Sequence, residues 1–546
     1  MTMPEPHSTH EVTNQPAARV GVDEFEANLP LVEGVRRHDA AWALDDLSAI
    51  GRHVGTAEFQ HAADLAHRYP PVLHTHDRQG NRVDEIEYHP AYHEVIASAV
   101  EHGAHTSAWA HPRAGANVAR AAAFMLFAQV EPGHACPISM THAVVPALRQ
   151  QPELADVWLP RVFGRGYDGR LVDAANKPGA LFGMAMTEKQ GGSDVRANRT
   201  VAMRTADGYL ITGHKWFCSA PMSDAFLVLA QTPEGIGCFL VPRVLDGGSR
   251  NVFRIQRLKN KLGNRSNASC EVEFDGTVGH LVGEPGAGIR TIIEMVARTR
   301  LDCVLGSAAG MRQSVAEAAW HVRGRAAFGR LLVDQPAMRS VVADLALESE
   351  AATATALRLA RAHDDDASHE EVAFRRLATA VSKYWVCKRG PAHAAEALEC
   401  LGGNGYTEDF PLAMRYREQP VMAVWEGSGN VIALDTLRAL AAPGVFEAFD
   451  AEVSQAGGVH REFDTHLRLV REEVRTLAEQ EPDDAATDAR RITEDLALVL
   501  QASLLLRYAP AAVSDAFVAS RLGDDRRWQY GALPTGSDLS GILARA

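Results

Sequence analysis

The sequence has few cysteines and no long hydrophobic run, and both shortages exclude whole classes of protein. Its seven cysteines are an odd number, widely spaced and without a C-x-x-C pair. This argues against a disulfide framework or a zinc ribbon and indicates reduced thiols in a cytoplasmic protein. The most apolar late segment, 496–513, is broken by Gln501, Arg507 and Pro510, so no membrane contact is expected. Residues 1–28 lack the pattern of a signal peptide and are expected to form a surface tail or a subunit-docking arm.

Several ligand-binding motifs are also absent. The chain has neither a Walker A loop nor an H-E-x-x-H pair. Its glycine clusters at 283–288 and 402–405 do not follow a strand of a β-α-β unit, which argues against a Rossmann site. The segment His74-Thr75-His76 offers two ligands of a metal site, but no further group completes it at ligand spacing. A polar loop is therefore the better interpretation there, and no metal is expected.

Composition and charge describe an ordinary globular protein. Hydrophobic residues make up 46% of the 546 residues and charged residues 23%, which excludes disorder, collagen and coiled coil as the main architecture. The net charge of −14 argues against a surface that binds nucleic acid or anionic membrane all over. A local basic patch remains compatible with this charge.

The hydrophobic pattern changes twice along the chain. From Pro90 to Gln150 the sequence is Ala-rich and helical in character, whereas 179–275 contains short apolar runs and a period-two segment typical of strands. After Gly288 the helical period returns, with helices expected at about 334–363, 369–400 and 427–440. We therefore expect an α+β, mainly α fold: an N-terminal arm and helical domain (1–178), a middle β-domain (179–285), a C-terminal helical domain (286–440) and an extra helical region (441–546).

Three segments carry residue types suited to chemistry. The stretch 186–194, MTEKQGGSD, offers backbone N–H groups and hydroxyls to a flat polar ring or a phosphate, but a solvated β-turn has the same composition. Trp216 and Phe217 leave a strand together and would wall an aromatic cofactor or fill a core. Glu426, beside Trp425, stands before a Gly-Ser-Gly turn that opens a helix, where a carboxylate also answers the helix dipole.

Taken together, the three segments resemble the acyl-CoA dehydrogenase family over about residues 110–440. Arg325-Ala326-Ala327-Phe328-Gly329 with Gln335 is similar to the family's R-x-x-F-G…Q segment, and 401–406, LGGNGY, with Arg417 resembles its second signature. The segment 259–274 and the extra C-terminal region bring the chain nearest to the AidB-type adaptive-response flavoproteins. The resemblance implies an N-terminal helical domain, a β-domain and a C-terminal four-helix bundle that binds FAD.

The same resemblance implies roles for individual residues. Glu426 is expected to be the base that removes the α-proton of an acyl-CoA or related small molecule, while a hydride passes to flavin N5, with weak dehydrogenase activity. The arginine and glutamine of the R-x-x-F-G…Q segment should reach an FAD held mainly by a neighbouring subunit, as in a homotetramer. The residues expected to bind FAD are Met184, Met186, Thr187, Gly192, Ser193, Trp216, Phe217, Cys218, Arg325, Gln335, Gly402, Gly403, Asn404, Ser428 and Asn430.

An alternative function also follows from the resemblance: a double-stranded DNA-binding protective flavoprotein of the response to alkylation damage, in which turnover is incidental. The arginines expected to contact DNA phosphates are Arg438, Arg521, Arg526 and Arg527. From residue 441 onward, however, the chain has 11 Arg, no Lys and 18 Asp and Glu, a net charge of −7. Charge alone therefore favours an ordinary packing domain whose arginines pair with carboxylates.

Overall fold

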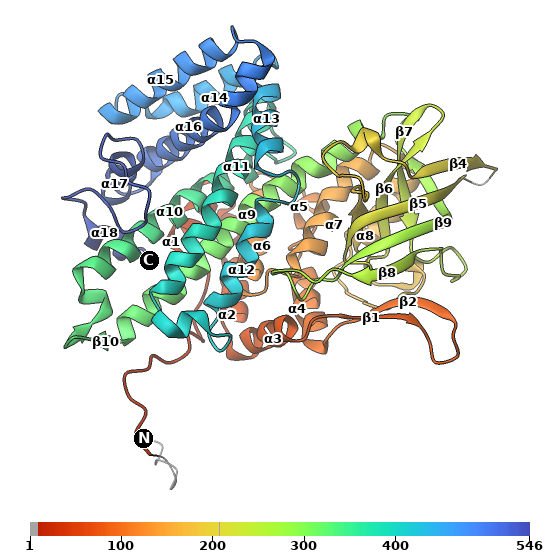
Figure 1. Ribbon diagram of the computed structural model, residues 1–546, viewed down its shortest axis with the longest axis horizontal. Coiled ribbons are helices and arrows are strands. Elements are labelled where there is room, and N and C mark those ends of the chain that lie inside the picture. The colour runs from red at the N-terminus through yellow and green to blue at the C-terminus, as the bar shows by residue number, and fades with distance from the viewer. Residues whose placement is uncertain (1–8, 207) are drawn as a thin grey trace.

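Helices, a β-barrel and more helices follow one another along the chain (Figure 1). The computed structural model describes residues 9–206 and 208–546. The mainly helical α+β fold predicted from the sequence is confirmed, with the barrel at one end of the molecule and the extra C-terminal helices at the other.

The N-terminal part is helical apart from one hairpin. Its helices are α1 (Leu29–Arg37), α2 (Leu44–Val54), α3 (Ala57–Arg68), α4 (Pro90–Glu101), α5 (Ser107–Ala110), α6 (Ala116–Val130), α7 (Ala135–Leu148) and α8 (Pro152–Val162). Every residue of α6 is buried, since its sequence is largely apolar and its one charged residue, Arg120, has a buried partner. The hairpin joins β1 (Val72–His76) to β2 (Arg82–Glu87), so the expected polar loop around His74 is wrong: His74 lies in a strand and its Nε2 contacts Glu87 Oε2 at 2.8 Å.

Seven strands form the middle sheet, and it closes on itself. They are β3 (Phe182–Ala185), β4 (Val201–Thr205), β5 (Gly208–Ser219), β6 (Ala225–Thr232), β7 (Gly235–Pro242), β8 (Arg254–Leu258) and β9 (Ser269–Val282). The order is β3-β6-β4-β5-β9-β7, and pairing of β7 with β6 completes the barrel. In β9, Val272 and Phe274 are buried while Glu273 and Asp275 are exposed, as the period-two pattern predicts, but Glu271 is buried as well, where it pairs with Lys259.

The C-terminal helices coincide closely with those expected from the hydrophobic period. They are α9 (Gly288–Gly324), α10 (Pro336–Arg361), α11 (His369–Glu399), α12 (Leu412–Met422) and α13 (Gly429–Leu440), with a small hairpin of β10 (Ala326–Ala327) and β11 (Arg330–Leu331). The Arg120 guanidinium of α6 pairs with the Asp302 carboxylate of α9, and both are almost wholly buried. This ion pair ties the N-terminal helices to the longest helix of the bundle.

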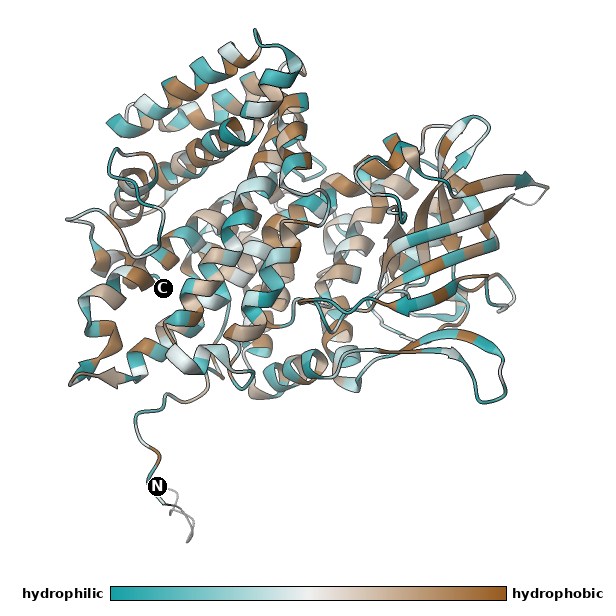
Figure 2. Cartoon of the chain, in the orientation of Figure 1, coloured by the Kyte–Doolittle hydropathy of each residue, from teal (hydrophilic) through white to brown (hydrophobic). Residues whose placement is uncertain are grey.

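Five more helices cover one side of this bundle. They are α14 (Val445–Val453), α15 (Arg461–Leu477), α16 (Pro482–Tyr508), α17 (Ala511–Arg521) and α18 (Leu539–Leu543). The outer helix α15 is mostly hydrophilic (Figure 2) and buries only a narrow stripe that includes Phe463, Leu467 and Val470. No helix in the described part of the chain is long and apolar enough to cross a membrane.

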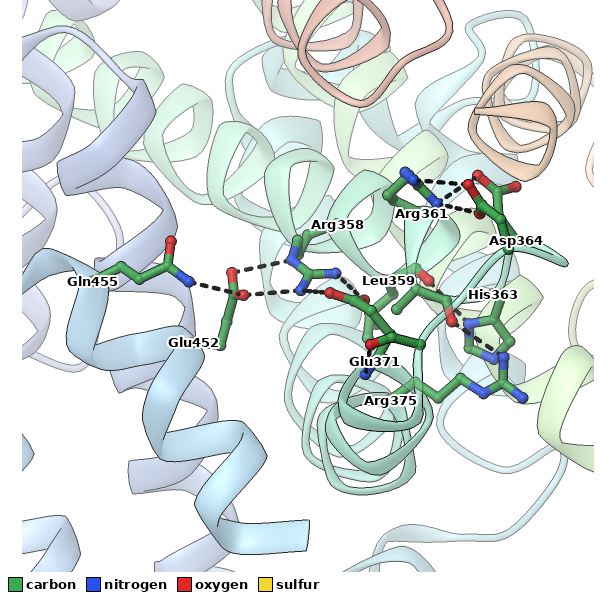
Figure 3. Close-up of polar contacts among 12 residues, drawn as sticks. Arg358, Leu359, Arg361, His363, Asp364, Glu371, Arg375, Glu452 and Gln455 are labelled. Atoms are coloured by element: carbon green, nitrogen blue, oxygen red, sulfur yellow. Dashed lines mark hydrogen bonds and ion pairs between the residues drawn. The ribbon is translucent and has the colours of Figure 1, made fainter. Parts of the chain in front are cut away.

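One arginine joins this extra region to the bundle. Arg358 of α10 donates from Nη2 to Glu452 of α14 at 2.8 Å and from Nη1 to Glu371 of α11 at 2.9 Å (Figure 3). Glu452 also accepts a hydrogen bond from Arg507 of α16 at 2.8 Å. Because the arginine and both its carboxylates sit between helices, the extra region is expected to fold as part of the bundle rather than as a tethered module.

We predict that Asp302→Asn destabilises the protein by about 3–5 kcal/mol, because it leaves the Arg120 charge buried without its carboxylate. Thermal unfolding of wild type and variant measures the loss. Asp64→Asn is the matched control, since Asp64 pairs with Arg68 at the surface and such pairs contribute about 0–1 kcal/mol. Equal effects of the two substitutions would contradict the structural role of the buried pair.

Candidate active site

A buried ion pair shapes the loop of the first predicted segment. Glu188 accepts hydrogen bonds from Lys215 Nζ at 2.8 Å and from the Arg199 amide at 2.7 Å, and neither Glu188 nor Lys215 is exposed. Burial raises the pKa of Glu188, but the Arg199 amide and the Lys215 ammonium outweigh it and bring the pKa to about 2. Lys215 also donates to the Leu229 carbonyl at 2.8 Å. The Glu188 carboxylate therefore has a structural role: through Lys215 it holds the loop against β5 and β6.

The residues around this pair form a small polar surface, the ledge, which consists of Thr187, Gly192, Ser193 and the Trp216 ring. The Trp216 amide donates to the Thr187 carbonyl at 2.8 Å, which holds the loop against β5. A Cβ at Gly192 would lie 2.4 Å from Thr187 Oγ1, so only glycine lets the loop fold back over Thr187. Met184 and Met186 are half-buried on the same strand-to-loop segment, and Ser193 is exposed at its tip.

The two aromatics and the cysteine of the second segment separate in the fold. Trp216 is half-buried and Phe217 exposed, and Lys259 Nζ lies 3.2 Å from the centre of the Trp216 ring. Cys218 is fully buried beside Cys270 in the barrel, where burial raises the pKa of its thiol. Its side chain is thus in the core, and only its backbone is available to a ligand near Trp216.

Glu426 occupies a strained turn between α12 and α13. Its φ of +58° is in the left-handed region, where a residue with a side chain is uncommon. Arg300 Nε of α9 donates to the Glu426 carbonyl at 3.0 Å, and Lys383 of α11 donates to the Gly427 carbonyl. Two cations from neighbouring helices thus fix the backbone that follows the Glu426 side chain.

The carboxylate itself is buried and only partly satisfied. Glu426 Oε2 has no hydrogen-bond partner among the described residues. Burial raises the pKa of Glu426 above the ordinary glutamate value, and the Thr299 hydroxyl and the charges of Arg300 and Lys383 offset this only in part. A carboxylate that is buried, held in place and not neutralised is a candidate general base.

The structure adds residues that the sequence alone did not assign. Cys136 of α7 lies close enough that the charge of Glu426 contributes, after burial, to raising the pKa of the Cys136 thiol to about 11. Lys261 also acts on Cys136, and burial lowers the pKa of Lys261 to about 8. Lys261 lies in the segment 259–274, whose resemblance to the AidB-type proteins was the one feature of the sequence that could have pointed to this lysine. Cys136, Lys261 and Glu426 place this site where α7, the barrel and the α12–α13 turn meet.

Ser428 and Asn430 follow Glu426 at the start of α13. Both are exposed, and the Ser428 side chain makes no capping hydrogen bond to the helix. Lys388 packs against Gly429, with its Nζ 2.9 Å from the position a Cβ would take there. The amide end of α13 and this ammonium together favour a bound anion.

The remaining predicted FAD residues gather at the other end of the bundle. Arg325 follows the last residue of α9 and precedes β10, Gln335 Nε2 donates to the Ala327 carbonyl at 3.0 Å, and Gly402 to Asn404 begin the short helix η5 (Gly402–Tyr406). With about 1.5 Å of rise per residue, the 37 residues of α9 span roughly 55 Å. The N-terminus of α9 contacts β7 of the barrel, and β10, which follows the C-terminus of α9, lies at the far side of the molecule from the barrel (Figure 1).

The four predicted DNA-contact arginines have different environments. Arg438, Arg526 and Arg527 are exposed, and Trp528 beside them is 88% exposed. Arg521 is mostly buried and pairs with Asp344 and Glu348 of α10. Arg521, Arg526 and Arg527 line a cavity of about 790 Å³ between α11, α15, α16 and α17, which Glu473, Glu494 and Asp495 also line. Among the described residues no group of His, Cys, Asp and Glu is arranged to hold a metal ion.

Family models match three consecutive parts of the chain. Residues 14–169 match the adaptive response protein AidB N-terminal domain, residues 183–277 the acyl-CoA dehydrogenase middle domain, and residues 286–441 the acyl-CoA dehydrogenase C-terminal domain. Together they cover most of the chain up to the extra helices.

Individual proteins agree with these models. AidB of Escherichia coli (strain K12) is 45% identical over 513 residues, 93% of this chain and 94% of that protein. Caenorhabditis elegans ACDH-11 in complex with C11-CoA superposes with a TM-score of 0.83 at 24% identity, over 100% of this chain and 94% of that one. An acyl-CoA dehydrogenase of Bacillus anthracis complexed with FAD gives a TM-score of 0.62 at 17% identity, over 79% and 76%. The two solved structures share the fold.

We predict that Glu426→Gln raises stability at neutral pH by about 1–3 kcal/mol, because it removes a buried charge that lacks a full set of partners. The pKa of Glu426 is higher in the folded than in the unfolded state. The free energy of unfolding of the wild type therefore falls as pH rises from the ordinary glutamate pKa through the folded-state pKa, whereas that of the variant does not. Below the ordinary glutamate pKa both side chains are neutral, and the two proteins should unfold at the same temperature. Thermal unfolding at acidic and at neutral pH measures the difference.

Glu284→Gln serves as the control, since Glu284 is exposed and makes no side-chain hydrogen bond within the described chain. A Glu426→Gln midpoint at or below that of wild type at neutral pH would contradict the prediction.

Proposed function

Because the chain belongs to the acyl-CoA dehydrogenase family, in its AidB subgroup, we propose that it binds FAD and oxidises an acyl-CoA or a related acyl thioester, with Glu426 as the base. The observation that carries this proposal is the buried Glu426 carboxylate, with one oxygen unpaired, at the junction of barrel and bundle. The related structure with C11-CoA and the one with FAD, named above, support the choice of substrate class and cofactor.

The proton step follows from the surroundings of Glu426. A base must be ionised at working pH and still have appreciable affinity for a proton, and a raised glutamate pKa meets both needs. Oε2 is the atom that takes the α-proton, since it has no partner in the described chain. Arg300 and Lys383 bind the carbonyls of residues 426 and 427 rather than Oε2, so they hold the turn without blocking that oxygen.

The same turn offers a donor to the thioester. The Glu426 amide makes no hydrogen bond to any acceptor within residues 9–206 and 208–546. An unpaired N–H beside the base can polarise the thioester oxygen and so acidify the α-carbon. FAD, when bound, supplies the acceptor for the two electrons that leave the β-carbon.

The chain offers residues suited to the cofactor at two places. Near the barrel, Thr187 with Gly192, Ser193 and the Trp216 ring form the ledge for the flavin, and the start of α13 favours a phosphate. At the far end, Arg325, Gln335 and the open backbone at Gly402 and Gly403 suit a diphosphate, since no atom lies within 4 Å of a Cβ added at either glycine. Along α9, roughly 37 Å separate Arg300, which binds the Glu426 carbonyl, from Arg325, which is too far for one FAD to touch both places in one chain. We therefore propose that a second copy completes each site, as in a homotetramer.

We predict that Glu426→Gln lowers the rate of flavin reduction by an acyl-CoA at least 100-fold and leaves FAD bound, because only the proton acceptor is lost. Anaerobic mixing of the FAD-loaded protein with straight and branched acyl-CoAs, followed by flavin absorbance, measures the rate. Glu317→Gln is a matched control: burial raises the pKa of Glu317 to about 7, but it lies elsewhere on α9. Reduction of Glu426→Gln at the wild-type rate would exclude Glu426 as the base.

A second candidate function is binding of double-stranded DNA. The supporting observation is the exposed loop of Arg526, Arg527 and Trp528 at the mouth of the large cavity, with Arg438 exposed on α13. Two unburied guanidinium groups and an aromatic ring suit phosphate contacts and stacking. Arg527 also pairs with Asp525, and the acidic residues of the cavity limit the positive potential.

We predict that Arg526→Ala with Arg527→Ala lowers DNA affinity about tenfold in moderate salt and reduces the slope of log affinity against log salt by about 2, because two phosphate contacts are lost. Duplex binding at several salt concentrations measures both. Arg36→Ala with Arg290→Ala removes the same charge from exposed sites elsewhere and is the control. If both double variants bound DNA alike, this loop would not be a DNA site.

A further inference from the structure

An N-terminal arm reaches the end of the bundle where the predicted diphosphate residues lie. The arm, residues 9–28, precedes α1 and has no regular secondary structure over most of its length. Trp320 Nε1 of α9 donates to the Ala17 carbonyl at 2.8 Å, and Arg312 donates to the Ala27 carbonyl at 2.7 Å. These contacts lay the arm along the C-terminal half of α9, toward Arg325.

Asn14 of the arm pairs with the backbone beside Arg325. Its Oδ1 accepts from the Ala326 amide at 2.7 Å, and its Nδ2 donates to the Ala326 carbonyl at 2.9 Å. The side-chain amide thus occupies the place of a neighbouring strand on β10. The backbone of Asn14 has a φ of +55°, which asparagine tolerates better than most residues.

Gln15 joins the two separate predicted diphosphate segments. Its Oε1 lies 3.2 Å from Arg325 Nη1 and 3.4 Å from Asn404 Nδ2, and both nitrogens donate to it. Arg325 Nη1 also donates to the Asn14 carbonyl at 2.8 Å. Arg325, which follows α9, and Asn404 of η5 therefore both donate to one amide oxygen of the arm.

The arm orients Arg325 without neutralising it. All of its acceptors for Arg325 are neutral, and Arg325 forms no ion pair with a carboxylate in the described part of the chain. Its Nε and Nη2 donate no hydrogen bond to any described residue, so they are free to bind an anion. A guanidinium that is fixed through one nitrogen and keeps its whole charge is prepared for a phosphate group.

We propose that Asn14 and Gln15 are positioning residues of the cofactor site. They line the site beside the segments of Arg325 and Asn404 and hold these two side chains in place for the diphosphate of an FAD bound by a second copy of the chain. This inference rests on the proposed function. It adds the arm to that site and requires the arm's acceptors to be uncharged.

The sharpest test is Gln15→Glu. The substitution keeps the acceptor oxygen and the size of the side chain, so a purely structural contact would persist or strengthen. As a positioning residue for an anion site, a carboxylate at 15 instead neutralises Arg325 and repels the diphosphate. We expect the affinity of the deflavinated full-length protein for FAD to fall about tenfold in Gln15→Glu, and we expect the same fall in Gln15→Ala and in Asn14→Gly. Glu11→Ala, exposed on the same arm, should bind FAD like wild type.

Equilibrium titration with FAD gives the affinity, and the mass of the assembly in solution is measured in parallel. Loss of affinity in Gln15→Glu with an unchanged assembly supports the inference. Wild-type affinity in Gln15→Glu, or a loss explained by dissociation of the assembly, overturns it. Failure of the wild-type protein itself to bind FAD would be a failure of the proposed function, and the inference would fall with it.

Discussion

The cost of burying a charge without a partner governs how this chain is assembled. Lys215 pairs with Glu188 inside the barrel, Arg120 with Asp302 between α6 and α9, and Arg358 with Glu452 between α10 and α14. The paired residues are 27, 182 and 94 positions apart in the sequence. If one partner moved away, the other charge would be left buried and poorly solvated. Each pair therefore also fixes the relative position of its two elements. The junction of barrel and bundle is built from such restraints.

Glu426 differs from the glutamates of these ion pairs in the direction of its pKa shift. Glu188, whose burial is outweighed by an amide and a lysine, and Glu348, whose burial is outweighed by Arg389 and Arg521, both have pKa values of about 2. A carboxylate stabilised so strongly has little affinity for a proton. At Glu426 the nearby cations bind backbone carbonyls instead, and burial leaves the pKa raised. The same residue type is therefore a structural anion in two places and a candidate base in the third.

The sequence predicted what depends on local pattern and missed what depends on distant partners. The helical hydrophobic period placed α10, α11 and α13 within a few residues, because each helix buries a face that repeats along its own length. The short apolar runs within 179–275 correspond to the almost wholly buried strands β6 and β7, and the period-two segment corresponds to β9. The β1–β2 hairpin was missed because its polar strands show no such face. The family motifs located Glu426, but neither period nor motif could reveal that Lys383 and Arg300, 43 and 126 residues away, hold its turn. Likewise Arg521 looked like a surface cation until the fold placed Asp344 beside it.

The length of α9 makes the proposed cofactor site a property of the assembly rather than of one chain. Arg300, which binds the Glu426 carbonyl, and Arg325 are separated by roughly 37 Å along α9 at about 1.5 Å per residue, so on the proposed function an FAD that uses groups from both places joins two copies. Binding and assembly are then linked, and each must strengthen the other by the same factor. On this proposal the arm matters because its contacts with Arg325 form within one chain, without a second copy. By holding Arg325 with neutral oxygens, it removes the entropic cost of ordering a long side chain while preserving the charge that the incoming diphosphate must meet.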